Sequence, residues 1–96
     1  MIATQYRNRL TIIGDVLLAA LTSSSEGGVS PSVLMRRCNL SYKGLESLVG
    51  QLVEAGLLRR LDAERGVKYV ASEKGCKYLE QCKQFEAFTE SFGLQL

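Results

Sequence analysis

The chain has 96 residues, of which 46% are apolar, and a formal net charge of +2. This length predicts one small domain over residues 1–96, a size at which oligomerisation often adds to a modest core. Histidine is absent and no Cys-x-x-Cys pair occurs, which removes the commonest general base and argues against a zinc site.

A broadly apolar helix is predicted from about Gln5 to Leu21. Its apolar side chains cover more than one stripe, as in helices that contact more than one neighbour. Core packing within one chain and contact with a second subunit both explain this width, and the sequence leaves the two open. The apolar run Val16–Leu21 is far shorter than the roughly 20 residues that a bilayer requires, so we expect a cytoplasmic protein without a membrane span.

A second, short helix is predicted to begin at Ser30-Pro31, with serine as the N-cap and proline in the first turn. It follows a serine- and glycine-rich loop and ends near residue 38. Arg36 and Arg37 stand at its end, where cations suit the negative end of the helix dipole. Contact with phosphate groups is the functional alternative for both arginines.

A third helix is predicted over residues 41–55, after a turn at Asn39-Leu40 and with Ser41 as its N-cap. Its apolar residues form one narrow stripe, which consists of Leu45, Leu48, Val49 and Leu52. The opposite face is polar and carries Lys43, Ser47, Gly50 and Glu54, flanked by Glu46 and Gln51. Gly44 and Gly50 each weaken the helix by about 1 kcal/mol relative to alanine. Close approach of DNA or another element explains these glycines, and so does sequence drift.

A basic hairpin is predicted next, after a left-handed helix cap at Ala55-Gly56. The strands Leu57–Leu61 and Val67–Ala71 are rich in branched residues and flank a turn over residues 62–66. Val29 is predicted to add a short strand beside them. The basic residues of the hairpin are Arg59, Arg60, Arg65 and Lys68.

The last helix is predicted over residues 72–92, with Ser72 as its cap. A heptad-like seam with the spacing 4-3-4-3 runs along it, formed by Tyr78, Cys82, Phe85, Thr89 and Phe92. Phe88 lies close to this seam. Three phenylalanines in the last 12 residues exceed what a lone exposed helix tolerates in water, so we expect them to be buried. A two-fold dimer through this helix is the preferred solution, and a helix folded back on its own domain is the alternative.

Cys82 is one of three cysteines and lies on the seam itself. Near a two-fold axis, two copies of Cys82 would approach within disulfide range. A bond between chains would stabilise a small dimer by constraining its unfolded chains. A small buried thiol is the alternative reading of this residue.

The order of these elements predicts a winged helix-turn-helix with a C-terminal dimerisation helix. A short helix is followed by a helix with a polar face, a glycine that ends this helix, and an Arg-rich hairpin. The fold class is then mainly α with a small β-hairpin (α+β). Residues 7–68 hold nine Lys or Arg and six Asp or Glu, whereas residues 69–96 hold three Lys and four Glu. The positive excess therefore lies in the half that is expected to meet DNA.

An ordered series of residues carries a family resemblance over about residues 6–80. The series runs Asn39-Leu40-Ser41-Tyr42, Leu45, Leu48-Val49, Leu52-Val53, Gly56-Leu57-Leu58, Tyr69, Ser72-Glu73-Lys74-Gly75 and Tyr78-Leu79. It resembles small archaeal winged-helix proteins, which include dimeric transcription regulators and chromatin proteins, with similar short versions in archaeal viruses. The resemblance implies a homodimer held by the last helix, with the third helix in the major groove and the wing on the backbone or minor groove. Chromatin-type relatives have a long C-terminal coiled coil, whereas 24 residues follow Ser72 here, which favours a local regulator over a DNA-coating protein.

We therefore expect a sequence-specific transcriptional regulator that binds double-stranded DNA as a homodimer. Side chains near the start of a recognition helix contact base edges, and cations contact phosphates. The residues expected in the groove are Ser41, Tyr42, Lys43, Ser47 and Gln51. Those expected on the backbone are Arg36, Arg37, Arg59, Arg60, Arg65 and Lys68.

A winged-helix adaptor that binds proteins and not DNA is the alternative function, because the third helix is weakly basic and carries Glu46 and Glu54. An enzyme is not expected, since the chain lacks histidine and a glycine loop that could cradle phosphate. We accordingly expect no catalytic residue, no cofactor and no metal.

Overall fold

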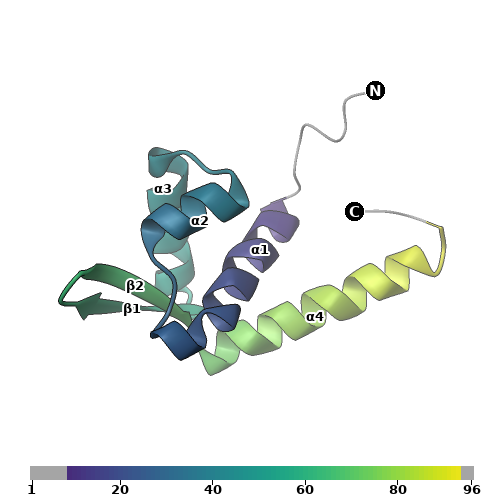
Figure 1. Ribbon diagram of the computed structural model, residues 1–96. Coiled ribbons are helices and arrows are strands. Elements are labelled where there is room, and N and C mark those ends of the chain that lie inside the picture. Colours follow the sequence, from purple (N-terminus) through teal and green to yellow (C-terminus); the bar gives the residue numbers. More distant parts are fainter. Residues whose placement is uncertain (1–8, 94–96) are drawn as a thin grey trace.

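A computed structural model describes residues 9–93 of the chain (Figure 1). Over this range the chain forms helices and one hairpin, which agrees with the predicted α+β class. The elements are α1 (Arg9–Thr22), the 3-10 turn η2 (Ser24–Glu26), α2 (Pro31–Cys38), α3 (Tyr42–Glu54), β1 (Leu58–Ala63), β2 (Gly66–Ala71) and α4 (Glu73–Glu90). The predicted start of the first helix, near Gln5, lies outside the described residues.

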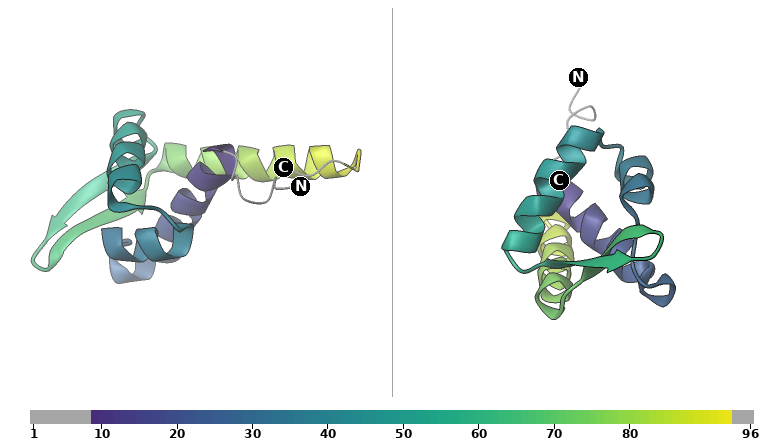
Figure 2. Two further views of the ribbon diagram at one scale, coloured as in Figure 1. Left: turned by 90° about the horizontal axis from the view of Figure 1, so that it is seen from above. Right: turned by 90° about the vertical axis from the view of Figure 1, so that its left-hand side faces the viewer.

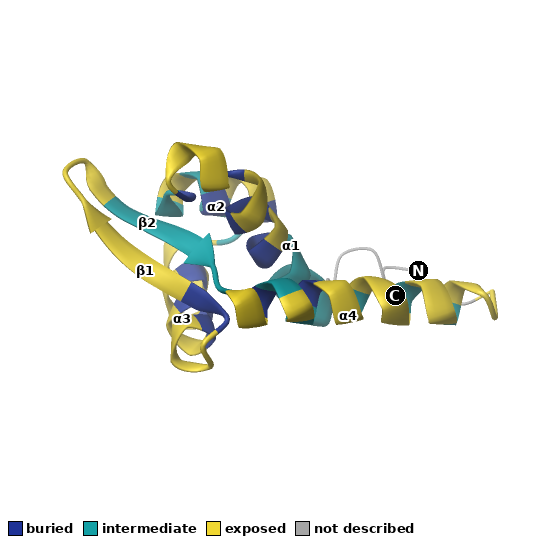
Figure 3. Cartoon of the chain, turned by 90° about the horizontal axis from the view of Figure 1, so that it is seen from below, coloured by how far each residue is buried: buried dark blue, intermediate teal, exposed yellow. Residues whose placement is uncertain are grey.

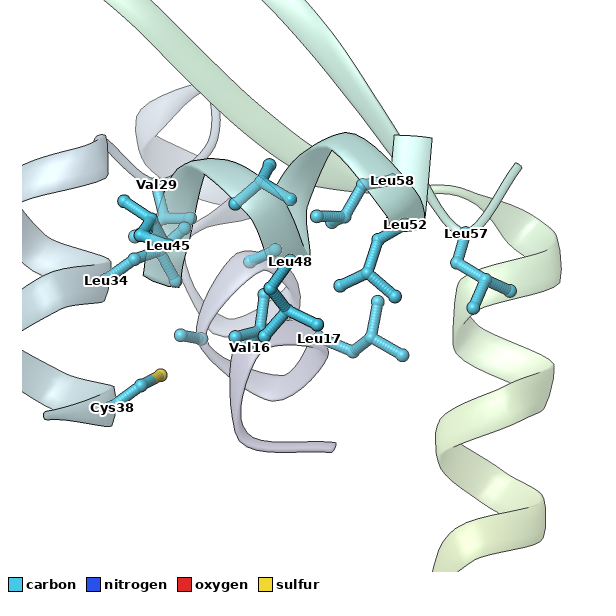
Figure 4. Close-up of a cluster of buried hydrophobic side chains, with 13 residues drawn as sticks. Val16, Leu17, Val29, Leu34, Cys38, Leu45, Leu48, Leu52, Leu57 and Leu58 are labelled. Atoms are coloured by element: carbon cyan, nitrogen blue, oxygen red, sulfur yellow. The ribbon is translucent and has the colours of Figure 1, made fainter. Parts of the chain in front are cut away.

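Three helices enclose the core. Val16 and Leu17 of α1 are fully buried and face the apolar stripe of α3, as Figure 4 shows. Leu34 of α2 and Leu58 of β1 close the same cluster from two other sides. The predicted stripe of α3 is confirmed, since its buried residues are Leu45, Leu48, Val49 and Leu52.

Serine hydroxyls cap the N-termini of α2, α3 and α4, as the sequence predicts. Ser30, Ser41 and Ser72 each accept a hydrogen bond from the backbone N–H three residues later, at 3.4, 3.0 and 3.0 Å. Each bond satisfies an N–H that the first turn of a helix leaves without an intrahelical partner. The ends are equally well defined, because Asn39 closes α2 at φ 54° and Gly56 follows α3 at φ 82°.

The hairpin is tighter than predicted. Leu58 to Ala63 pair antiparallel with Ala71 to Gly66, so only Glu64 and Arg65 form the turn. The predicted five-residue turn over residues 62–66 is therefore wrong at both ends. The physical reason is Gly66, which takes φ 120° and lets the second strand start at once after a two-residue loop.

Val29 joins this hairpin as the sequence predicts. It forms an isolated antiparallel bridge with Tyr69, through hydrogen bonds of 2.9 and 2.8 Å. The preceding Gly28 takes φ 118°, and a Cβ there would lie 2.7 Å from the Tyr69 carbonyl oxygen. Glycine is thus required where the loop approaches β2.

The first turns of α4 pack closely against the end of the α3–β1 connection. Gly75 is buried there, and a Cβ on this residue would overlap the Leu57 carbonyl oxygen. The Ser72 hydroxyl donates to the Gly56 carbonyl oxygen at 2.6 Å, and Leu79 packs on α1. Beyond these contacts α4 extends away from the other elements and is largely exposed (Figures 1 and 3).

Candidate nucleic-acid interface

The hairpin and the α2–α3 unit lie at one end of the molecule, opposite the free end of α4 (Figures 1 and 2). A groove runs between α3 and the hairpin, and its polar lining comes from Tyr42, Glu46, Arg60 and Tyr69. Arg60 pairs with Tyr69 across the strands, so both side chains stand on the sheet face that turns toward α3. The strand register therefore brings a cation of the hairpin opposite the exposed start of α3.

The outward face of α3 is polar along its first two turns. Tyr42, Lys43 and Ser47 are exposed, and the Tyr42 side chain is 61% accessible. The Tyr42 hydroxyl donates a hydrogen bond of 2.9 Å to a carboxylate oxygen of Glu46, one turn further on. This hydrogen bond, together with the negative charge of Glu46, raises the pKa of the Tyr42 phenol. The phenol therefore stays protonated at neutral pH and remains a donor.

Glu46 is not among the residues that the sequence predicts to contact bases, but the structure places it in the second turn of α3, on the side that borders the groove. The sequence does carry a signal for it. A tyrosine and a glutamate four residues apart face each other on a helix surface, so the pair is predictable from spacing alone.

Gln51 is held on a different side of α3. Its amide oxygen accepts a hydrogen bond from Arg9 at the start of α1, and its amide nitrogen lies 3.5 Å from the Ser47 hydroxyl. The groove between α3 and the hairpin does not include Gln51. The Ser41 hydroxyl is likewise engaged, because it caps α3. Contact of either residue with bases stays a prediction, and for Gln51 such contact requires these bonds to be exchanged.

The cations of the hairpin differ in surroundings. Arg65 occupies the exposed two-residue turn between β1 and β2. Arg60 makes an ion pair of 3.5 Å with Asp62 on its own strand, and both side chains remain mostly exposed. Arg59 is exposed and faces away from α3, since its partner across the strands is Val70.

The remaining predicted phosphate contacts gather on the other side of α2. Arg36, Arg37 and Lys68 border one polar hollow with Ser23 and Ser30. Glu26 borders the same hollow, so its lining carries one carboxylate beside the three cations. The predicted basic residues therefore divide into two groups, one beside α3 and one between α2 and β2.

The residues of the predicted α4 seam differ in how far they are buried. Cys82 lies beside α1, in a hollow that also includes Leu10 and Leu79. Burial, together with the charge of Glu86, raises the pKa of the Cys82 thiol. The phenylalanines project elsewhere and are largely accessible in the single chain, with exposed fractions of 47% for Phe85, 61% for Phe88 and 67% for Phe92.

A family model described as winged helix-turn-helix matches residues 6–90. The chain belongs to this family. The α2–α3 pair is its helix-turn-helix, α3 stands in the position of the recognition helix, and β1 and β2 form the wing. The predicted winged helix-turn-helix fold is therefore confirmed.

One solved structure with this fold is Sso10a-2, a DNA-binding protein from Sulfolobus solfataricus. The two are similar with a TM-score of 0.76 and 20% sequence identity, over 90% of this chain and 85% of that chain. At this identity the likeness shows a shared winged-helix fold. No curated protein matches the sequence.

Two further observations bear on this winged helix. Within the described residues, no helix combines the length and the apolar character needed to cross a membrane. Nor do residues 9–93 contain a group of three or more Cys, Asp or Glu side chains arranged to hold a metal ion.

Proposed function

We propose that this winged helix is a sequence-specific regulator of transcription that binds double-stranded DNA as a homodimer inside the cell. The observation that carries the proposal is the groove between α3 and the wing, bordered by Tyr42 on one side and Arg60 on the other. A recognition helix enters the major groove while a neighbouring basic element contacts phosphates, and this arrangement provides both surfaces together.

The position of each residue suggests whether it would contact bases or the DNA backbone. Tyr42, Lys43 and Ser47 occupy the first two turns of α3, where side chains meet base edges. Arg60 and Arg65 of the wing contact the backbone beside that groove. Arg36, Arg37 and Lys68 would contact a neighbouring stretch of backbone, and Arg59 points to the outer side of the wing.

A protein–protein adaptor is the second candidate function. It is favoured by the carboxylates of Glu46 and Glu54 on the exposed surface of α3, because negative charge there opposes phosphate. Titration of the purified protein with a random duplex at low salt separates the two candidates. A regulator binds the duplex, whereas an adaptor leaves it free.

The homodimer is proposed to form through the phenylalanines of α4. Phe88 and Phe92 contact each other edge to face at 5.1 Å and extend the apolar surface of a helix whose far half has no neighbour in the described chain. Phe85 and Phe88 lie roughly 60° apart around α4 at 100° per residue, and Phe92 follows the end of the helix in contact with Phe88, so a second copy of α4 can cover all three. Burial of each phenylalanine is worth about 1.5–3 kcal/mol.

Phe88→Glu is therefore expected to convert a dimer into a monomer. Two buried rings are lost from each dimer, so its dissociation constant should rise at least ~100-fold. Sedimentation over a range of concentrations measures this, with unmodified protein at twice the 10.6 kDa of one chain. Ala87→Glu is the matched control, because it adds the same charge at an exposed position roughly 100° around α4 from Phe88. Unmodified protein that stays a monomer throughout would contradict the dimer.

An interchain disulfide through Cys82 is proposed only for oxidised protein. Cys82 stands at the edge of the phenylalanine face, next to α1, and its raised pKa keeps the thiol protonated and slow to oxidise at neutral pH. Electrophoresis without reductant, after mild oxidation, tests the bond. A product that runs only as monomer counts against it.

A further inference from the structure

Glu46 is a carboxylate on the surface that the proposed function turns toward DNA. It is exposed on α3, in the groove that it shares with Arg60 of the wing. A negative charge that faces phosphates weakens binding to every sequence, unless the carboxylate meets a hydrogen-bond donor that repays the repulsion. The bases, and not the backbone, offer such donors, because phosphate and sugar-linking oxygens only accept.

The Glu46 carboxylate is exposed and holds one hydrogen-bond donor within the described chain. Tyr42 donates to one carboxylate oxygen at 2.9 Å, and across residues 9–93 no further hydrogen bond to this carboxylate is formed. A carboxylate has about four acceptor positions, so a second donor can still bind. Both residues lie in the first two turns of α3, which is where recognition helices reach base edges.

We propose that Glu46 reads a cytosine by accepting a hydrogen bond from its N4 amino group in the major groove, with Tyr42 as the positioning residue. This inference rests on the proposed function. Guanine presents two acceptors there and thymine one, and both repel a carboxylate. Adenine places its N7 acceptor beside its N6 donor, whereas cytosine presents the donor without an adjacent ring acceptor. Cytosine is therefore the base that a carboxylate selects.

The test is selection of binding sites from a randomised duplex library by unmodified protein, Glu46→Gln and the control Glu54→Gln. The amide introduced by Glu46→Gln can donate to N7 and accept from N6 of adenine, so this variant should change one selected position from cytosine to adenine. The preference at that position should shift by roughly 10- to 100-fold, while the rest of the site is unchanged. Glu54→Gln removes the same charge at the far end of α3 and should retain cytosine. Tyr42→Phe should reduce the preference without changing the base.

Two results would overturn the inference alone. In the first, Glu46→Gln tightens binding to all duplexes equally and selects the same site, which makes Glu46 a repulsive charge only. In the second, unmodified protein binds DNA but enriches no cytosine position that depends on residue 46. Failure of unmodified protein to bind any duplex at low salt overturns the proposed function as well, so the two failures are distinguishable.

Discussion

Gly75→Ala is expected to destabilise the fold by about 1–3 kcal/mol, although alanine favours helices over glycine by about 1 kcal/mol. The new methyl group would overlap the Leu57 carbonyl oxygen and lie 3.4 Å from a methyl of Leu17. That carbonyl cannot move freely, because it accepts the backbone N–H of Ser72 at 3.1 Å. Relief of the overlap would therefore shift the start of α4 against the core.

Gly50→Ala is the matched control for this prediction. Gly50 is also helical, and apart from its chain neighbours and the backbone of its own helix no atom of the described residues lies within 4 Å of its Cβ position, so alanine there should stabilise α3 by about 1 kcal/mol. Urea unfolding followed by circular dichroism, at one fixed protein concentration, measures both variants. If Gly75→Ala proves as stable as unmodified protein, the close packing of α4 on the α3–β1 connection is wrong.

Arg60→Ala/Arg65→Ala is expected to have the largest effect on DNA binding. Each lost phosphate contact makes the plot of log affinity against log salt less steep by about 0.9. A dimer of the double variant loses two contacts in each chain, so the magnitude of its slope should fall by about 4. The loss should be similar for all sequences, because phosphate contacts carry no direct sequence information. Affinity measured at several salt concentrations, on two unrelated duplexes, tests both statements.

Lys77→Ala/Lys83→Ala provides the control for the wing variant. These lysines are exposed on α4, and their removal changes the net charge of the chain by the same amount. The slope of log affinity against log salt for this control variant should stay close to that of unmodified protein, since α4 points away from the wing (Figure 2). An equal loss of slope in both variants would mean that net charge, and not the wing, governs binding.

Most of the fold follows from local sequence signals. Ser30, Ser41 and Ser72 begin helices because each hydroxyl caps the backbone three residues later, and that interaction needs no information from the rest of the chain. Gly56 ends α3 for an equally local reason, its positive φ. The buried stripe of α3 is read from helical spacing in the same way.

The features that the sequence did not reveal depend on contacts between distant residues. Arg9 and Gln51 are 42 positions apart, and their hydrogen bond turns a predicted base contact toward α1. The surroundings of Gly75 likewise depend on how α4 meets Leu57, which spacing along one helix cannot show. The division of the basic residues into two groups follows from the register of β1 and β2, which the sequence alone does not give. This register places Arg60 and Lys68 on opposite faces of the sheet.

Binding of DNA through α3 and the wing is tested first by titration of the unmodified protein with a random duplex over a range of salt concentrations. If a dimer neutralises about 6–10 phosphates, its affinity should fall by roughly 10³–10⁵ between 50 and 200 mM salt. A flat salt response, or no binding at low salt by a folded protein, would contradict this binding mode and favour the adaptor.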